Sequence, residues 1–515
     1  MVKQKEMVTG SIYLNHIDHD KNTDGVRTLA ECLQEYGHSD YYPLHMPGHK
    51  RNIYGQMPEE ALRMDITEID GFDNLHQPEG ILKEMQKRAA GLYGADETFY
   101  LINGSTCGIL SAVSAAVPAC GHILIARNCH KSVYHACYLR NLTISYLYPE
   151  MLEAYDICEA ITSKQVEEAL KREPDIDAVL IVSPTYEGRI ADIDAISRVV
   201  HTKGIPLIVD EAHGAHLGFS QGFAENSCRR GADLVIHSVH KTLPAMTQTA
   251  LLHVNGELIS RERLKRFLNI YQSSSPSYVL MASIENALNL VEKKGNRMFA
   301  DFIHRWERMC GELSTMKHLS ILPSGEKQDP GKLLVSVKKT GLSGQQLYDM
   351  LLEDYQLQPE MAAPEFVLAM FTIGDTEEGF IRTTRALLAI DGSLEDRDEP
   401  EEQDKCSAAG TGYQKCREEL KLLPRKVTEQ ITGLQALPLA RAWDMDREWC
   451  PVSGCVGRYC SEFINLYPPG IPKAVPGEVI DDNLISWIAD CAHKGLHVQG
   501  IKYCGSEMYL PVLRK

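Results

Sequence analysis

Short apolar runs alternate with longer amphipathic segments through residues 96–255. Strands that alternate with helices predict βαβ units and a largely parallel sheet. The runs are almost continuously apolar, which is typical of strands that are covered on both faces. Helical periodicity is clearest over Thr106–Val117 and Asp192–Thr202. The predicted strands are Thr98–Ile102, His122–Ala126, Leu142–Leu147, Ala178–Ser183, Pro206–Asp210, Leu234–His237 and Ala250–Val254.

The pattern changes after this region. A long helical pattern over Ser283–Ser314 precedes a second α/β stretch, with a strand at Lys332–Lys338 and helices near Ser343–Asp354 and Glu377–Ile390. Residues 394–414 are charged and then rich in Gly, Ala and Ser, without periodicity, which indicates a solvated linker. We therefore expect an N-terminal segment with a large domain over 1–282, a small α/β domain over 283–393, an acidic linker over 394–414 and a C-terminal domain over 415–515.

Composition narrows the class of protein. The 515 residues fit about three domains, and 53 Lys and Arg against 70 Asp and Glu give a net charge of -17. This acidic balance argues against nucleic acid as a partner. No apolar stretch is long enough to span a membrane, and the N-terminus has no apolar segment of the kind that directs secretion. We expect a cytoplasmic protein with no membrane partner.

The spacing of the cysteines does not indicate a metal site. There are fifteen, but no Cys-x-x-Cys or paired Cys/His pattern occurs. Since such spacings mark most zinc sites, we predict no metal site and expect reduced, mostly buried thiols.

Polar groups gather where the predicted strands end, and ligands of open α/β sheets bind at that edge. Lys241 follows one strand within Ser238-Val-His-Lys-Thr-Leu-Pro, and Asp210 ends another within Leu-Ile-Val-Asp-Glu-Ala-His. The turn Asn103-Gly-Ser-Thr-Cys-Gly opens a helix. A lysine amine, a carboxylate and helix N-terminal amides are what pyridoxal phosphate requires for its aldehyde, its ring nitrogen and its phosphate.

Motifs along almost the whole chain resemble the ornithine/lysine/arginine decarboxylases. The resembling segments are residues 44–50 (LHMPGHK), 65–70 (DITEID), 103–108 (NGSTCG), 127–132 (RNCHKS), 183–188 (SPTYEG), 209–216 (VDEAHGAH), 238–244 (SVHKTLP), 273–278 (SSSPSY) and 467–472 (YPPGIP). The chain is similar to the short branch of this family, which lacks an N-terminal wing domain. The resemblance implies a fold-type-I, aspartate aminotransferase-like α/β fold. Its parts would be a mostly parallel large-domain sheet, a small α/β domain and a C-terminal α+β domain.

The resemblance also implies roles for individual residues. Lys241 would bind pyridoxal phosphate covalently, Asp210 would pair with the ring nitrogen, and Ala212 and His130 would lie on the two faces of the ring. Lys241 or a nearby histidine, His213 or His240, would be the acid that protonates the substrate carbon. The phosphate group would be held by Ser105, Thr106, Ser238 and His240, with Thr185 near the ring hydroxyl. Ser275 would reach the phosphate of the partner in a homodimer with shared active sites, and a higher oligomer stays open.

The implied reaction is α-decarboxylation of a small cationic amino acid, in polyamine biosynthesis. We favour arginine and leave lysine and ornithine open. Asp65, Glu68, Asp70 and Glu478 are candidates for the substrate's distal cation, although the first three could form an exposed acidic turn and Glu478 could be structural.

Other functions are compatible with the same cofactor. An aminotransferase or another lyase could share the fold, because a fold does not fix the reaction. An aminotransferase would need an arginine for the α-carboxylate, for which Arg382 and Arg385 are the candidates. A catalytically silent regulatory paralogue is the third alternative, which the intact set of Lys241, Asp210 and His130 disfavours.

Overall fold

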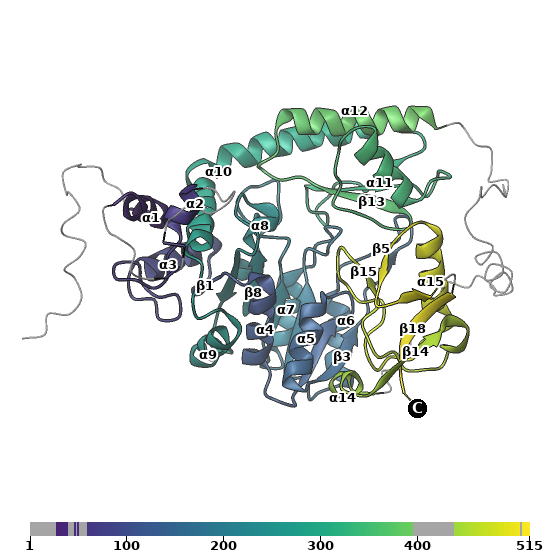
Figure 1. The fold of residues 1–515 in the computed structure, drawn as a ribbon, viewed down its shortest axis with the longest axis horizontal. Coiled ribbons are helices and arrows are strands. Elements are labelled where there is room, and N and C mark those ends of the chain that lie inside the picture. Colours follow the sequence, from purple (N-terminus) through teal and green to yellow (C-terminus); the bar gives the residue numbers. More distant parts are fainter. Residues whose placement is uncertain are drawn as a thin grey trace, which may run out of the picture.

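The computed structural model describes residues 27–39, 46–47, 49–50, 59–394, 437–504 and 507–514. The predicted linker, from residue 395 on, lies outside these residues. Three helices come first and lie to one side of the central sheet (Figure 1). They are α1 (Leu29–Gly37), α2 (Glu59–Met64) and α3 (Ile81–Tyr93). Thr28 and Glu31 form a reciprocal capping box that starts α1.

A seven-stranded sheet forms the centre of the molecule, in the order β1-β9-β8-β7-β6-β2-β3. Strands β3, β2, β6, β7 and β8 are parallel, and β9 is antiparallel to both of its neighbours. The largely parallel sheet predicted from the sequence is therefore confirmed. Its strands are β1 (Glu97–Leu101), β2 (His122–Ala126), β3 (Thr143–Leu147), β6 (Ala178–Val182), β7 (Leu207–Asp210), β8 (Leu234–Ser238) and β9 (Ala250–Val254).

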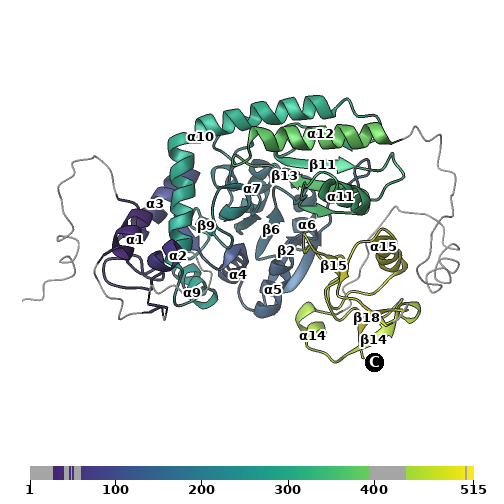
Figure 2. The same cartoon turned by 45° about the horizontal axis from the view of Figure 1, so that its top comes forward.

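Helices cover both faces of this sheet (Figures 1 and 2), and alternate strand residues enter two separate hydrophobic cores. Val209 and Val235 pack on one face with α3, α6 (Ser163–Arg172), α7 (Ile193–His201) and α10 (Tyr278–Leu313). Ile208 and Ile236 pack on the other face with α4 (Gly104–Ala116), α5 (Lys131–Arg140) and α9 (Arg261–Tyr271). Burial on both faces explains why each strand is apolar at nearly every position.

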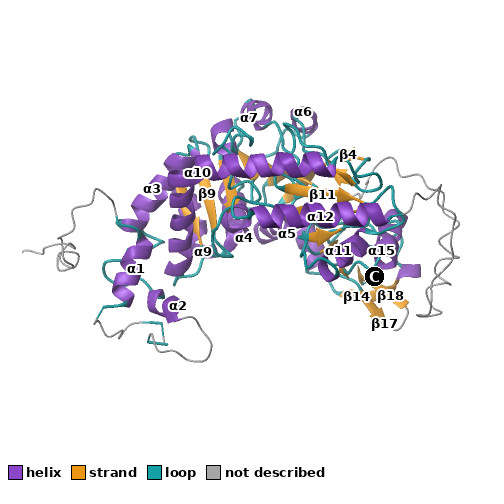
Figure 3. Cartoon of the chain, turned by 90° about the horizontal axis from the view of Figure 1, so that it is seen from above, coloured by secondary structure: helices purple, strands orange, loops and turns teal. Residues whose placement is uncertain are grey.

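The long helix α10 connects the central sheet to a smaller antiparallel sheet (Figures 2 and 3). Its first part packs beside α1 and α2, and its last part lies along α12 (Glu377–Ser393). The predicted domain boundary between residues 282 and 283 thus falls inside one helix. The smaller sheet has the order β10-β11-β13-β12, formed by β10 (Ser320–Ile321), β11 (Lys332–Ser336), β13 (Phe366–Met370) and β12 (Met361–Ala362), with α11 (Gly344–Glu353) beside it.

The C-terminal residues form a third body next to α5 (Figure 1). Its three-stranded sheet consists of β14 (Arg447–Pro451), β18 (Glu507–Leu513) and β17 (Lys502–Cys504). The remaining elements there are α14 (Leu439–Trp443), η3 (Val452–Gly454), α15 (Asp482–His493) and the pair β15 (Asn465–Leu466) and β16 (Val498–Gln499). The large domain also contains two small elements, the hairpin β4 (Met151–Leu152) and β5 (Ile157–Cys158) and the turn η2 (Ser227–Arg230). None of the described helices combines the length and apolarity that crossing a bilayer requires.

Candidate active site

Lys241 lies on α8 (Val239–Thr242), a single turn that follows β8 at the carboxyl edge of the central sheet. Its amine is 3.1 Å from Nε2 of His213. Burial lowers the pKa of Lys241, while the negative charges of Asp210 and Glu360 oppose that shift. A lysine that loses its proton more readily than usual is a better nucleophile toward an aldehyde.

Asp210 ends the neighbouring strand β7, and only 5% of its surface is exposed. Its Oδ1 accepts a hydrogen bond from the backbone of Ala212 at 3.2 Å. Burial raises the pKa of Asp210, and the cationic Lys241 opposes this. A buried carboxylate in this position is suited to pair with a cationic ring nitrogen, because the pairing offsets the cost of removing its charge from water.

His130 is the N-cap of α5, and its Nδ1 lies 2.9 Å from the hydroxyl of Ser132. Burial, with the positive charge of Lys241, lowers the pKa of His130 to about 4, so its ring is neutral at pH 7. The Pro-rich loop from the C-terminal body packs against this ring. Gly470 there has a φ of 76°, and a Cβ on it would lie 3.3 Å from Nε2 of His130. A neutral imidazole that this loop holds in place can stack on an aromatic cofactor.

The start of α4 is a suitable anion site. The side chain of its N-cap residue, Asn103, accepts from the backbone of Ser273 instead of capping the helix. The hydroxyl of Ser238 donates to the hydroxyl of Ser105 at 2.9 Å, so the ends of β8 and β1 meet here. Uncapped amides and two hydroxyl groups at a helix N-terminus bind phosphate well.

The other predicted cofactor residues surround the same edge. Thr185 follows β6, and its hydroxyl donates to Glu187 at 3.1 Å. His240 is held through Nδ1 by the carbonyl of Thr249 at 2.9 Å. Ser275 is exposed in the loop between α9 and α10, two residues from Ser273. Thr106 lies in the first turn of α4 and Ala212 follows β7.

One buried lysine was not found from the sequence. Lys332 is the first residue of β11 in the smaller sheet, and its Nζ lies 2.7 Å from Nδ1 of His213. His213 therefore stands between two lysines. Gly188, with a φ of 95°, permits this approach, since a Cβ on it would come within 2.8 Å of the Lys332 side chain.

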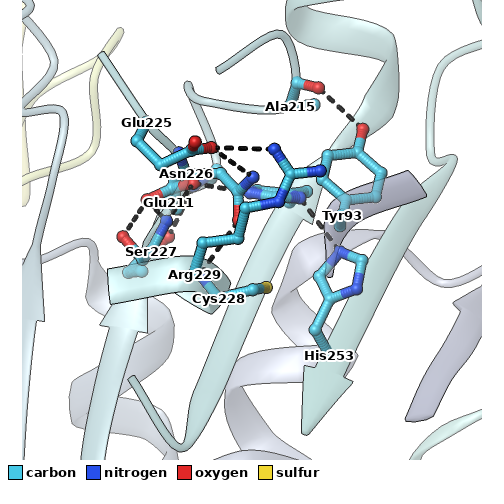
Figure 4. A network of polar contacts seen from close by, with 12 residues as sticks. Tyr93, Glu211, Ala215, Glu225, Asn226, Ser227, Cys228, Arg229 and His253 are labelled. Atoms are coloured by element: carbon cyan, nitrogen blue, oxygen red, sulfur yellow. Dashed lines mark hydrogen bonds and ion pairs between the residues drawn. The ribbon is translucent and has the colours of Figure 1, made fainter. Parts of the chain in front are cut away.

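A second feature that the sequence did not indicate is a buried chain of polar groups that begins at Glu211, the residue after Asp210 (Figure 4). Glu211 contacts the hydroxyl and amide of Ser227 and lies 2.8 Å from Nε2 of His237. His237 continues to His253 at 3.0 Å, and His253 to the hydroxyl of Thr98 at 2.7 Å. Burial raises the pKa of Glu211 to about 8, although its hydrogen bonds from Ser227 oppose the shift.

The titration of Glu211 makes folding depend on pH. The unfolded glutamate ionises near pH ~4.3, whereas the folded one keeps its proton up to about pH 8. The stability associated with this proton is present below pH ~4.3 and is lost as pH rises through 8. We expect Glu211→Gln, which cannot ionise, to gain in melting temperature relative to the native protein between pH 6 and pH 9. Calorimetry at both pH values tests this, and a constant difference would contradict it.

The structure separates the four candidates for the substrate's distal cation. Asp65 lies 3.3 Å from His49, Glu68 is half-buried and Asp70 is exposed, all in the segment between α2 and α3. Glu478, in contrast, is buried in an ion pair with Arg127 at 3.0 Å and also accepts from the backbone of Val475. Of the two roles left open for Glu478, this ion pair favours the structural one.

Loss of Glu478 should be costly for this reason. Arg127 also donates to the carbonyl of Pro472, so it fastens the C-terminal body to the end of β2. We expect Glu478→Ala to lower the free energy of unfolding by ~3–5 kcal/mol, because a buried guanidinium loses its counter-charge. Glu167→Ala, which breaks the exposed pair with Lys171, is the control and should cost under ~1 kcal/mol. Urea denaturation measures both, and equal effects would refute the structural role.

Comparison with known proteins places these features in a family. The family model described as "Orn/Lys/Arg decarboxylase, major domain" matches residues 28–327. The chain belongs to the ornithine/lysine/arginine decarboxylase family. Arginine decarboxylase of Bacillus subtilis is 31% identical over 486 residues, covering 92% of this chain and 95% of that protein. Lysine decarboxylase of Hafnia alvei is 27% identical over 56% of this chain and 42% of its own length.

The solved structures confirm the predicted fold class. Lysine decarboxylase of Francisella novicida superposes with a TM-score of 0.77 at 18% identity, over 95% of this chain and 81% of that one. Members of this decarboxylase family use pyridoxal phosphate, and the residues present fit it. A nucleophilic lysine, a buried carboxylate, a neutral imidazole and uncapped helix amides all lie at one sheet edge. The described part of the chain has no group of three metal-ligating side chains.

Proposed function

We propose that this protein decarboxylates a basic L-amino acid, preferably arginine, with pyridoxal phosphate bound to Lys241. The proposal is carried by one observation: Lys241, Asp210, His130 and the N-terminus of α4 converge at the carboxyl edge of the sheet, in a chain that belongs to this decarboxylase family. Arginine is preferred because the Bacillus subtilis arginine decarboxylase matches nearly end to end, whereas the Hafnia alvei lysine decarboxylase matches over only part of its length.

Pyridoxal phosphate, when bound, supplies an electron-withdrawing ring that accepts the electron pair released as CO₂ leaves. The residues of this chain bind and orient it. Ser105, Thr106, Ser238 and the amides of α4 after Gly104, whose own amide donates to Gln248, would hold the phosphate, with His240 beside them. Asp210 keeps a proton on the ring nitrogen. His130 and Ala212 would lie on the two faces of the ring, and Thr185 would lie near its hydroxyl.

The amine of Lys241 would hold the cofactor, and the substrate amine would compete with it for that position. Once it is free, Lys241 can hold a proton within reach of the carbon that loses its carboxylate, and His213 contacts it at 3.1 Å. The buried setting excludes water, which strengthens each of these electrostatic contacts. These groups perform a decarboxylation by placing the proton at the substrate carbon after CO₂ departs.

A direct assay tests the substrate class. The purified protein with pyridoxal phosphate is incubated with arginine, lysine or ornithine, and CO₂ and the product amines agmatine, cadaverine and putrescine are measured. We expect agmatine to form fastest. Failure of all three substrates would refute the proposed function while leaving the family assignment intact. Formation of keto acid instead of CO₂ would identify an aminotransferase. Of the two arginines that are candidates for such an enzyme, Arg382 donates to the backbone carbonyls of Tyr355 and Gln356.

We also propose that the protein acts as a cytoplasmic homodimer in polyamine biosynthesis. The exposed loop of Ser275 supports this, because it lies beside the N-terminus of α4 and is accessible to a second copy. Light scattering of the purified protein measures its oligomeric state. A Ser275→Ala variant that binds pyridoxal phosphate as tightly as the native protein would contradict a role of that residue at the phosphate.

A further inference from the structure

Three nitrogen-bearing side chains form a continuous line in the interior between the two larger sheets. The amine of Lys332 lies 2.7 Å from Nδ1 of His213, and Nε2 of His213 lies 3.1 Å from the amine of Lys241. Lys332 comes from β11, His213 from the loop after β7 and Lys241 from α8. Lys332 thus connects the smaller sheet to the site.

The burial of Lys332 has no adequate structural explanation. Only 3% of its surface is exposed, and its other close contact is the sulfur of Met370 at 3.6 Å. Within the described residues, no carboxylate oxygen forms an ion pair with its amine. Lysine is seldom fully buried without such a partner, because removing an ammonium group from water is costly. A methionine or leucine would fill this position at lower cost, so the amine is retained for its chemistry.

Several charged and titratable groups surround this amine. Glu187 and Asp329 approach from the loops after β6 and before β11, and Glu360 from the turn before β12; the positive charge of Lys241 acts from α8. The ring of Tyr186 lies 5.4 Å away and its hydroxyl donates to Glu360. Burial, opposed chiefly by Asp329, lowers the pKa of Lys332 to about 8. Lys332 is therefore an ammonium at neutral pH that can release its proton.

The geometry fixes which nitrogen of His213 carries the hydrogen. Burial and the two lysines lower the pKa of His213, so its ring is neutral and carries one N–H. An ammonium on Lys332 donates to Nδ1, and the single N–H is then on Nε2, directed at Lys241. When Lys332 gives a proton to Nδ1, Nε2 can pass its own proton on toward Lys241.

We propose that Lys332 is a positioning residue that orients His213 and supplies, through it, the proton that replaces the departing carboxylate. The inference rests on the proposed decarboxylation. The bond from the α-carbon to the carboxylate breaks, its electron pair stays with the substrate, and CO₂ leaves. The proton moves from Lys332 to His213 Nδ1, and that of Nε2 moves through the free amine of Lys241 to the α-carbon. Lys332 recovers a proton from water.

The test compares Lys332→Met and Lys332→Gln with the native holoenzyme, and Lys339→Met, an exposed lysine in the turn after β11, is the matched control. The first measurement is the pH titration of the visible absorbance of the bound cofactor without substrate. Loss of the Lys332 charge should move the midpoint of this titration to higher pH, because a nearby cation no longer disfavours the protonated form of the bound cofactor. The second measurement is the aldehyde fraction, which is the fraction of CO₂-releasing turnovers that yield an aldehyde and the amine form of the cofactor. These products form when the proton is added to the cofactor instead of to the substrate carbon.

We expect both Lys332 variants to raise the aldehyde fraction at least ~10-fold and to shift the midpoint, with the control unchanged. A shifted midpoint with an unchanged aldehyde fraction would overturn the supply of the proton. An unchanged midpoint would show that Lys332 carries no charge beside the bound cofactor and would overturn the proposal, even if the rate of CO₂ release fell. Should Lys332→Met fail to fold, Lys332→Gln carries the same test, since its amide can still donate to His213 but holds no acidic proton. Absence of CO₂ release by the native enzyme would contradict the proposed function alone, because the midpoint is measured without substrate.

Discussion

Replacement of Lys241 by alanine should reduce decarboxylation by at least ~10⁴-fold, because both covalent attachment of the cofactor and proton transfer at the substrate carbon depend on this amine. The variant should also lose the visible absorbance that native protein gains when pyridoxal phosphate binds to the lysine. Burial lowers the pKa of Lys241, so the native amine reacts with the aldehyde at neutral pH.

The measurements are a spectroscopic titration with pyridoxal phosphate and the rate of CO₂ release. Lys203→Ala, in an exposed turn after α7, is the control for loss of a lysine far from the site, and it should match the native protein in both assays. A Lys241→Ala protein that still forms the absorbing species would show that another amine holds the cofactor. Lys332 would then be the first residue to examine, because it shares His213 with Lys241.

The central sheet could be predicted because its signals are local. Strand β2 was expected at His122–Ala126 and occurs there, since the four consecutive apolar residues after His122 need cover on both faces. The position of Lys241 followed from the same argument, because a polar residue directly after a parallel strand must lie at the carboxyl edge. Its proximity to Asp210 required only that β7 and β8 be neighbours, as they are.

The partners of these residues could not be predicted, because they come from distant parts of the chain. Lys332 opens an apolar strand, and a lysine in that position usually extends its amine into water. Its contact with His213 spans 119 residues and depends on how the smaller sheet packs against the larger one. Glu211 presents the same difficulty: its neighbour Asp210 faces the site, while Glu211 faces Ser227 and His237 in the interior.

The role of Glu478 could not be predicted from its residue type alone. A glutamate in a Pro-rich loop could meet a cationic substrate or a cationic side chain, and both need the same carboxylate. The ion pair with Arg127, a residue 351 positions away, distinguishes these alternatives. Burial favours the structural role, since a buried arginine requires a counter-charge and an exposed one does not.

Asp210→Asn should lower the rate of CO₂ release by ~10³-fold while leaving the fold intact. Asparagine is nearly isosteric and its carbonyl oxygen can still accept the hydrogen bond from Ala212, so the loop after β7 keeps its geometry. What disappears is the negative charge that holds a proton on the ring nitrogen of the cofactor. Without that proton the ring withdraws electrons less strongly, and the loss of CO₂ slows.

The raised pKa of Asp210 leads to a second expected effect of this substitution, on the binding of the cofactor. Burial raises the pKa of this carboxyl group in the protein alone, and the charge of Lys241 and the hydrogen bond from the Ala212 amide oppose the shift. A cationic ring nitrogen beside it would stabilise the ionised form, so binding of pyridoxal phosphate and ionisation of Asp210 should favour each other. We therefore expect the cofactor to bind Asp210→Asn more weakly as well, by equilibrium dialysis, whereas Asp194→Asn, at an exposed ion pair on α7, should bind it normally. If Asp210→Asn kept a rate within ~3-fold of the native value, another group would have to protonate the ring, and the pairing of Asp210 with the cofactor would be wrong.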